Sequence, residues 1–464
     1  MSRKKIDDNV YNGILSGGVD AVLPSEVAEI SRRQLLKTGV SMTAWATAGQ
    51  MIGTKAALAQ TTSYAPIRNL IWISMNGGWD ILEVTDPKPS STSGIDMSYT
   101  WGEARDIANS TDGSKIGRWL PNIAALGQDR LVLRGLAMGT TSHMAGRVYM
   151  DTGILSNAGR VNAASIPSIV ASESVATIPI IQLNGGSEPQ TDRGLLKPVS
   201  VVRAGNLELY RSMYPNGEDA LQRKMAVLDY LRQSVTRLEG KVGANDRLSG
   251  LQTAEEKVRA QFAANVGAQL ALTDSDRTLF RANAPQGMNN GSIDAVALAL
   301  KMINNNISNC INLGFGGFDT HQSQTGRLQP ILTNVDFLIA KLVEGLRASG
   351  KLDSTLIVMY SDFGRTPKVN SSSGRDHWPV GGAVVMGGGI AGGRSVGSTD
   401  DNLQGADYVD PGTGLETTSG GVGAVQLNPT HLGGMVLELT LGSAYSQYRP
   451  YLQAIPALTR LKGS

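Results

Sequence analysis

The stretch Thr355–Trp378, TLIVMYSDFGRTPKVNSSSGRDHW, decides the fold. It begins with an uninterrupted apolar run, Leu356 to Tyr360, which predicts a buried strand of a parallel sheet. The run is followed by Asp362, and a loop rich in Gly and Ser then leads to His377. Because open α/β sheets place their ligand chemistry at the carboxyl ends of the strands, this stretch predicts an α/β fold and the position of its site.

Composition sets the broad class of the protein. The chain has 464 residues, of which 41% are apolar and 18% charged, enough for one large α/β domain or two to three smaller ones. The net charge of +2 gives no indication of nucleic acid binding. The single cysteine, Cys310, excludes an intrachain disulfide and a cysteine-based zinc site, and its apolar neighbours predict a buried, inert thiol.

The amino-terminal region, residues 1–59, resembles a twin-arginine export signal. Paired arginines in SRRQLLK (Ser31–Lys37) precede a weakly apolar segment and the A-x-A sequence Ala57–Ala59. The alternative is the basic start of an ordinary helix. As a signal, the region predicts the twin-arginine translocation machinery as a partner, a periplasmic or secreted location, and a mature domain over residues 60–464. No later segment is long and apolar enough for a transmembrane anchor after processing.

Apolar runs and helical periodicity predict the rest of the scaffold. Residues 206–285 are charged and amphipathic, which predicts a helical insertion of two long helices joined near Lys241–Gly250, serving as a lid or side layer. Two further helices are predicted over Gln324–Ala348 and Pro429–Leu441, the latter with a structural His431 near its start. Buried strands are predicted at Asn69–Met75, Leu131–Leu136, Ile178–Leu183, Cys310–Phe315 and Val380–Met386.

Two of these strands lead into polar residues. The first continues as NGGWD, in which two glycines permit a sharp turn that directs Asp80 back over the strand end; the alternative is an ordinary turn with a solvated aspartate. The strand Cys310–Phe315 continues as GGFDTH. Asp319 and His321 are two residues apart, so in extended backbone both side chains project to one side, as a pair of metal ligands requires.

A helix start contributes another polar group. After Leu131–Leu136 comes GTTSHMAGR, in which Ser142 and His143 precede or begin a helix and Arg147 lies one turn further on. A helix amino terminus favours an anion, and the arginine adds a positive charge. The alternative is that His143 only caps or packs the helix.

Together these strand-end loops predict a metal site. The candidate ligands are carboxylates and imidazoles, which suit Zn²⁺ or Mn²⁺ better than Mg²⁺ or Ca²⁺. A metal held there would polarise an ester oxygen, while Arg147 and Arg365 would neutralise anionic oxygens. The full set is Asp80, His143, Asp319, His321, Asp362 and His377.

The ordered motifs resemble a known family. The twin-arginine signal, the strand followed by GG-x-D, S-H-x-A with a later TG, GFDTH, and SDFGRTP with GRDHW are similar to the exported family DUF1501. That family is considered a distant relative of the alkaline phosphatase/sulfatase superfamily. The resemblance implies a three-layer α/β/α fold with a mostly parallel central sheet and a site at the carboxyl ends of the central strands.

The resemblance also implies roles for individual residues. Asp319, His321 and His377 look like the superfamily's first metal set. Asp362 matches a ligand of the second metal, but Phe363 follows it where a histidine is usual. The first-strand aspartate is also displaced, because Asn76 ends the strand and Asp80 comes four residues later. The second metal site is therefore weakened, and a single ion is implied. The position of the superfamily nucleophile falls on His143, with Ser142 beside it.

Two hypotheses follow. In the first, the protein is an exported metal-dependent hydrolase of phosphate or sulfate esters, acting on an anionic small molecule or polymer. Ser142 or a metal-activated water would attack, and Arg147 and Arg365 would bind the anion. In the second, it is a catalytically degenerate exported protein that binds a ligand or assembles with partners on the same fold, which Phe363 and the unclear nucleophile favour.

Overall fold

The computed structural model describes residues 67–89, 94–156, 161, 163–189, 199, 201–203, 218–243, 246–263, 266–402, 404–447 and 451–462. The predicted signal region over residues 1–59 lies outside these ranges. None of the described helices is long and apolar enough to cross a membrane.

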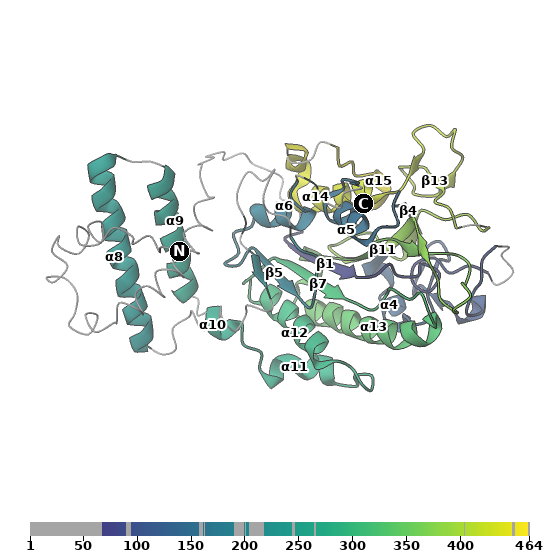
Figure 1. The fold of residues 1–464 in the computed structure, drawn as a ribbon, viewed down its shortest axis with the longest axis horizontal. Helices are drawn as coiled ribbons and strands as arrows, with labels where there is room; N and C mark the ends of the chain where they lie inside the picture. The colour runs from purple at the N-terminus through teal and green to yellow at the C-terminus, as the bar shows by residue number, and fades with distance from the viewer. Residues whose placement is uncertain are drawn as a thin grey trace, which may run out of the picture. The chain divides into compact units, whose positions relative to one another are not determined.

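An eight-stranded sheet forms the centre of the protein (Figure 1). Its strand order is β12-β4-β11-β8-β1-β7-β5-β6, and all the pairings are parallel except those of β11, which runs antiparallel to β4 and to β8. The strands are β1 (Asn69–Met75), β4 (Arg130–Ala137), β5 (Ile180–Leu183), β6 (Val201–Arg203), β7 (Cys310–Phe315), β8 (Thr355–Ser361), β11 (Val380–Gly387) and β12 (Arg394–Val396).

The central strands are buried on both faces. Every residue of β1, β7, β8 and β11 is buried, which explains why each reads as a continuous apolar run in the sequence. In the register of the sheet, Leu70 lies opposite Cys310 on one side and Leu356 on the other. The prediction of a buried, mostly parallel sheet is therefore confirmed, and the Cys310 thiol is buried with its pKa raised by that burial.

Helices cover both faces of the sheet and complete three layers (Figure 1). One face carries α5 (His143–Thr152), α6 (Ile166–Ser172), α14 (Pro429–Leu441) and α15 (Pro456–Thr459). The other face carries α4 (Pro121–Ala125), α11 (Asp274–Arg281), α12 (Asn290–Asn304) and α13 (Gln324–Ala348). This arrangement is the three-layer α/β/α fold that the family resemblance implies, and α13 and α14 have the bounds predicted from the sequence. His431 serves the start of α14, where its Nδ1 accepts from Asn428 N at 3.2 Å.

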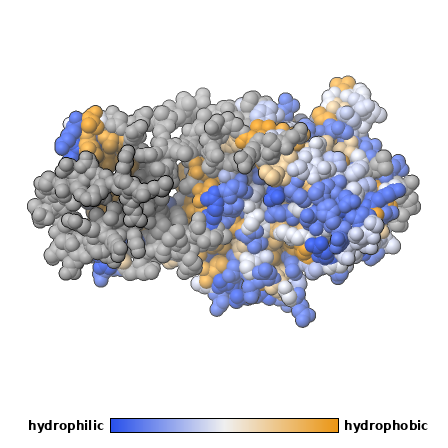
Figure 2. Space-filling view, viewed as in Figure 1, coloured by the Kyte–Doolittle hydropathy of each residue, from blue (hydrophilic) through white to orange (hydrophobic). Residues whose placement is uncertain are grey.

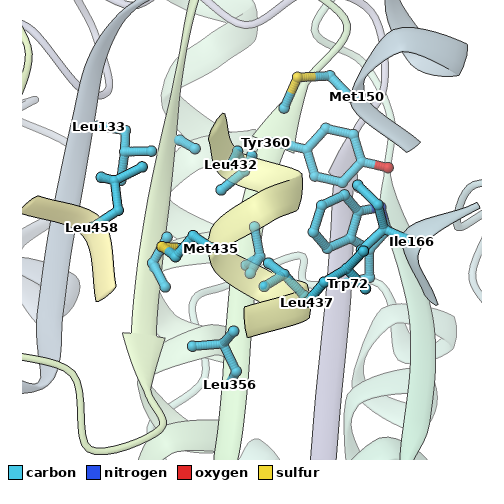
Figure 3. Close-up of a cluster of buried hydrophobic side chains, with 14 of the residues drawn as sticks. Trp72, Leu133, Met150, Ile166, Leu356, Tyr360, Leu432, Met435, Leu437 and Leu458 are labelled. Carbon is cyan, nitrogen blue, oxygen red and sulfur yellow. The ribbon is translucent and has the colours of Figure 1, made fainter. Parts of the chain in front are cut away.

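The layer beneath α14 holds a large apolar core (Figure 3). In Figure 3, Leu432 of α14 lies beside Tyr360, and Met435 lies on the other side of the helix, toward Leu458. The rings of Trp72 and Tyr360 lie 4.7 Å apart. Burying a side chain of this size stabilises a fold by roughly 1.5–3 kcal/mol. The polar tips of the two rings, Trp72 Nε1 and Tyr360 OH, donate to the buried Asp151 at 2.8 and 2.6 Å. Burial raises the pKa of Asp151 to about 6.

Two long helices, α8 (Glu218–Val242) and α9 (Asp246–Ala263), belong to a compact unit separate from the sheet domain. Charged side chains connect them. Arg232 Nε donates to Glu255 Oε2 at 3.0 Å, and Arg259 Nη2 lies 2.8 Å from Asp229 Oδ1. Two long helices are thus present, as predicted, but they end before residue 285: α10 (Val266–Gln269) and α11 follow them inside the predicted bounds, and α11 packs against α12 and α13 of the sheet domain. Its role as a lid or side layer stays a prediction.

Candidate metal centre

Four segments of the chain meet at the carboxyl ends of the central strands. β7, β1 and β8 are neighbours in the sheet, so the loops that follow them lie side by side. The loop after β8 forms a short antiparallel pair, β9 (Gly364–Arg365) with β10 (His377–Trp378), in which His377 lies opposite Arg365. Helix α5, which contacts β8, begins at His143.

Three histidines point their Nε2 atoms toward one carboxylate oxygen. Asp319 Oδ1 lies 3.0 Å from Nε2 of His321, 3.5 Å from Nε2 of His377 and 3.7 Å from Nε2 of His143. The Nε2 atoms of His321 and His377 are 3.0 Å apart. These four residues are called the histidine cluster below. Donor atoms of His143, Asp319 and His377 all lie within 4.8 Å of one another, as ligands of one metal ion would.

Each imidazole is oriented by a hydrogen bond at its Nδ1 atom, on the side of the ring opposite the Nε2 that faces the cluster. Nδ1 of His143 lies 2.6 Å from Asp362 Oδ2, and Nδ1 of His321 lies 2.9 Å from Asp376 Oδ1. Nδ1 of His377 lies 2.8 Å from the carbonyl oxygen of Thr141. Hydrogen bonds of this kind fix the ring orientation and the tautomer of metal-ligating histidines.

These contacts determine where the protons sit. A carbonyl oxygen only accepts hydrogen bonds, so Nδ1 of His377 carries a proton and donates it to the carbonyl oxygen of Thr141. In the neutral ring, Nε2 then bears a lone pair. Burial, with Arg365 and the other histidines, lowers the pKa of His377, which favours this neutral form. Nε2 of His321 lies 3.0 Å from Nε2 of His377 and 3.4 Å from Nη1 of Arg365.

The cluster fits a divalent metal ion. Nε2 of His143 is buried and has no hydrogen-bond partner among the described residues, a costly state that a metal bond would relieve. A tetrahedral zinc ion about 2.0–2.1 Å from each ligand holds its ligands about 3.3 Å apart. Four of the six donor–donor distances in the cluster, 3.0, 3.0, 3.5 and 3.7 Å, lie near that value.

Phe363 supports the imidazoles. Its ring is fully buried and lies 4.7 Å from the ring of His143 and 4.6 Å from that of His377, centroid to centroid. The residue that stands where a histidine is usual therefore packs between two members of the cluster. It restricts both rings but supplies no ligand.

Arg365 is buried and holds the loops together. Its guanidinium donates to the carbonyl oxygens of Gly78 at 2.7 Å, Arg375 at 3.0 Å and Phe318 at 3.1 Å, and to Asp319 Oδ1 at 2.6 Å. Burial raises the pKa of Asp319, but the hydrogen bond and charge of Arg365 outweigh it and leave the pKa below its usual value. With its nitrogens used in this way, Arg365 does not have the free donors expected of an anion binder.

A glycine lets α5 approach the strand end. A Cβ atom on Gly146 would lie 2.2 Å from the carbonyl oxygen of Asp362. Because real Cβ atoms do not come that close to backbone, only glycine permits the approach that brings His143 to Asp362. Glycine at this position, three residues after the histidine, is a signal for close packing that the sequence contained.

The structure does not bring Asp80 to the cluster. Its carboxylate is 1% exposed and is used elsewhere: Oδ2 lies 3.0 Å from Arg375 Nε and accepts from Gln324 Nε2 at 2.5 Å, and Oδ1 accepts from Leu82 N at 2.9 Å. The turn after β1 directs this side chain into the core of the domain. Asp80 therefore organises loops beneath the site, contrary to its expected role as a ligand.

The other predicted residues surround the cluster. Asp362 stands behind His143, and its Oδ1 accepts from Gly77 N at 3.2 Å. Ser142 is exposed, immediately precedes α5 and does not cap it with its side chain. The side chain of Arg147 is 45% exposed, with Nε 3.8 Å from Asp362 Oδ2. Asp376 orients His321 and the carbonyl oxygen of Thr141 orients His377, and the sequence predicts neither role. The one indication in the sequence is that Asp376 directly precedes His377.

Fold and cluster together define an α/β protein with a candidate metal centre at the carboxyl ends of its sheet. The chain belongs to the family described as protein of unknown function (DUF1501), whose profile matches residues 67–412. A comparison with curated proteins gives no match.

Several solved structures are similar over most of the chain. The PsFucS1 sulfatase from Pseudoalteromonas sp. has 12% identity, a TM-score of 0.33, and coverage of 93% of this chain and 77% of that one. The lipoteichoic acid synthase LtaP from Listeria monocytogenes has 8% identity, a TM-score of 0.33, and coverage of 89% and 81%. A TAB5 alkaline phosphatase variant with bound Mg has 14% identity, a TM-score of 0.31, and coverage of 71% and 94%.

Proposed function

We propose that the protein is an exported, metal-dependent hydrolase of phosphate or sulfate esters. The observation that carries the proposal is the convergence of three Nε2 atoms on Asp319 Oδ1, with that of His143 buried and unpartnered. His143, His377 and Asp319 would hold the ion, with His321, the most exposed of the three imidazoles, as a fourth donor. Imidazole-rich donors favour zinc or manganese over magnesium or calcium.

The surrounding residues suit an anionic ester. When bound, a divalent ion supplies a Lewis acid that polarises the ester oxygen. Arg147 is the exposed cation beside the cluster and would bind the remaining anionic oxygens, as would the first-turn N–H groups of α5. Ser142 is exposed at the start of that helix and is the candidate nucleophile. The hydrogen bond from Asp376 would orient the His321 ring toward the ion.

Metal content and turnover test the proposal. The mature protein is purified without chelator, analysed for bound metals, and assayed on a panel of aryl and sugar phosphates and sulfates. We expect about one equivalent of zinc or manganese and turnover that a chelator abolishes and the metal restores. His143→Ala and His377→Ala should lose the ion, whereas Ser142→Ala should keep it and lose turnover. A metal-free wild-type protein would overturn the proposal.

The second candidate function is a non-catalytic exported binding or assembly protein. The observation that favours it is Phe363, which follows Asp362 in the chain, packs between two imidazoles and supplies no ligand. A stoichiometric ion in a protein with no turnover on the whole ester panel would support this function over the first.

Export through the twin-arginine pathway is part of the proposal. It is supported by the sequence SRRQLLK and the A-x-A site that follows it. Replacing both Arg32 and Arg33 by lysine should keep the chain in the cytoplasm in a fractionation experiment, with the single variant Lys37→Gln as control. Unchanged export of the double variant would overturn this part.

A further inference from the structure

A carboxylate lies inside the apolar core of the sheet domain. Polar side chains are ordinary on the outside of the protein, where much of the visible described surface is hydrophilic (Figure 2). Asp151 of α5 differs because it is only 4% exposed and contacts Trp72 and Tyr360, whose rings lie among the apolar side chains of Figure 3. Taking a carboxylate out of water is unfavourable, and burial accordingly raises the pKa of Asp151.

Asp151 connects α5 to three other parts of the sheet domain. Its Oδ1 atom accepts the hydrogen bonds of Trp72 on β1 and Tyr360 on β8. Its carboxylate also forms a hydrogen bond with the side chain of Ser187, in the segment that follows β5. Ser187 Oγ in turn accepts from Nδ2 of Asn312, on β7, at 3.3 Å. The ends of β7 and β8 lead to the other members of the histidine cluster, so this network ties α5 to both of those strands.

The contact between Asp151 and Tyr360 is the second of two polar attachments of α5 to the end of β8. The first lies at the start of the helix, between His143 and Asp362. His143 and Asp151 are eight residues apart, so they lie on one face of α5, about 12 Å from each other along its axis. A single attachment would let the helix pivot about His143. Two attachments fix the direction of the helix and its position along the strand.

Stability alone does not account for a carboxylate at this position. Replacing a buried ionic or polar group by apolar side chains of similar volume is often neutral or stabilising. A satisfied polar network instead selects one arrangement of the packed elements, because other arrangements leave buried donors without acceptors. Here Trp72 Nε1 and Tyr360 OH both donate to one oxygen of Asp151, so a shift of α5 along the sheet would break both hydrogen bonds at once.

We propose that Asp151 is a positioning residue, which fixes α5 against β8 and thereby places His143 in the histidine cluster and Arg147 at its edge. The described hydrogen bonds of Asp151 reach no member of the cluster, so the residue acts only through the helix. The role depends on the hydrogen-bond acceptor, whereas ordinary core packing depends on the volume of the side chain. The inference deepens the proposed function, and it rests on that function only where a bound metal is the readout.

Zinc affinity of the metal-free mature protein is compared in two variants of this one residue. Asp151→Leu keeps the approximate volume but removes the acceptor, and we expect zinc binding to weaken about tenfold. Asp151→Asn should bind zinc within about threefold of wild type, because its oxygen accepts from both rings while its amide donates to the Ser187 hydroxyl. If Asp151→Leu does not fold, Tyr360→Phe removes one donor at nearly constant volume and should weaken binding about threefold.

A readout without metal separates this inference from the proposed hydrolase. The chain has four histidines, so the ring nitrogens of each can be resolved by NMR in metal-free protein labelled at histidine with nitrogen-15. The signals of His143, whose Nδ1 contacts Asp362, should change in Asp151→Leu and in Tyr360→Phe but stay as in wild type in Asp151→Asn. A wild-type protein that binds no zinc would refute the proposed function, and the His143 signals would then decide the inference alone.

Leu342→Ala is the matched control. Leu342 is fully buried on α13, which covers the face of the sheet opposite α5, so the cavity left by its truncation destabilises the same domain from the other side (Figure 1). This variant should change neither the zinc affinity nor the His143 signals. The inference is wrong if the folded acceptor-free variants leave those signals unchanged, if Asp151→Asn changes them as much as Asp151→Leu does, or if Leu342→Ala has the same effects.

Discussion

Replacing Asp362 by asparagine tests whether the carboxylates behind the histidines prepare them for a metal. The substitution keeps the size of the side chain and removes the charge that accepts from His143 Nδ1 at 2.6 Å. An amide accepts this hydrogen bond more weakly than a carboxylate does. The lone pair on Nε2 of His143 becomes less basic, and the tautomer with Nε2 free is favoured less.

The magnitude follows from burial. Loss of such an outer partner typically weakens metal binding 10- to 100-fold, or about 1.4–2.7 kcal/mol. The Asp362 side chain is 1% exposed, so water cannot replace its bond, and we expect a loss near 100-fold. Asp376 makes a longer bond, 2.9 Å, and is 58% exposed, so Asp376→Asn should cost about tenfold or less.

Competition with a coloured zinc chelator measures both affinities on metal-free protein. Circular dichroism and thermal unfolding of each variant establish that the fold is retained. The ordering of the two variants is the critical result. If Asp376→Asn costs as much as Asp362→Asn, or if neither changes the zinc affinity, the orienting role assigned to these carboxylates is wrong.

Three other substitutions have defined outcomes. Gly146→Ala forces a methyl group against the Asp362 carbonyl oxygen. It should lower the free energy of unfolding, measured in urea, by about 1–3 kcal/mol, and it should weaken zinc binding. If neither value changes, the close approach of α5 to Asp362 is wrong. Asp80→Ala leaves buried Arg375 unpaired and should cost about 3–5 kcal/mol, yet the folded fraction should bind zinc as wild type does. Burial and the Asp80 charge raise the pKa of Glu83 from 4.5 to about 7, so the folded chain keeps a proton that the unfolded chain releases. Stability therefore falls by about 3 kcal/mol as pH rises through that window, and Glu83→Gln should flatten the fall between about pH 5 and about pH 8 in thermal unfolding.

The sheet could be predicted from the sequence because burial on both faces leaves little choice of residue. Strands β1 and β7 and helices α13 and α14 have the bounds read from the apolar runs and the helical period. The site could be located for a related reason: Asp319 and Asp362 follow buried strands, and the ends of neighbouring parallel strands meet.

The roles of individual side chains depend on distant partners and could not be read in the same way. Asp80 forms an ion pair with Arg375, nearly 300 positions further along the chain. No sequence pattern near either residue predicts this pair. His143 faces the cluster because of how α5 is rotated, which a local pattern does not fix. The support of His377 comes from a backbone carbonyl, that of Thr141, which has no sequence signature at all.

The hydrogen bond between His377 and Thr141 joins positions 236 residues apart, and the remaining donors come from two segments in between. No contiguous fragment shorter than residues 143–377 contains the whole cluster, and closing so large a loop is slow compared with forming helices. A chain that ends before Asp376 includes β1, β7 and β8 but lacks both His377 and β11, the strand that joins β8 to β4. For the proposed metal centre we therefore expect tight binding of an ion only late in folding, and its appearance in a refolding experiment would time the completion of the sheet.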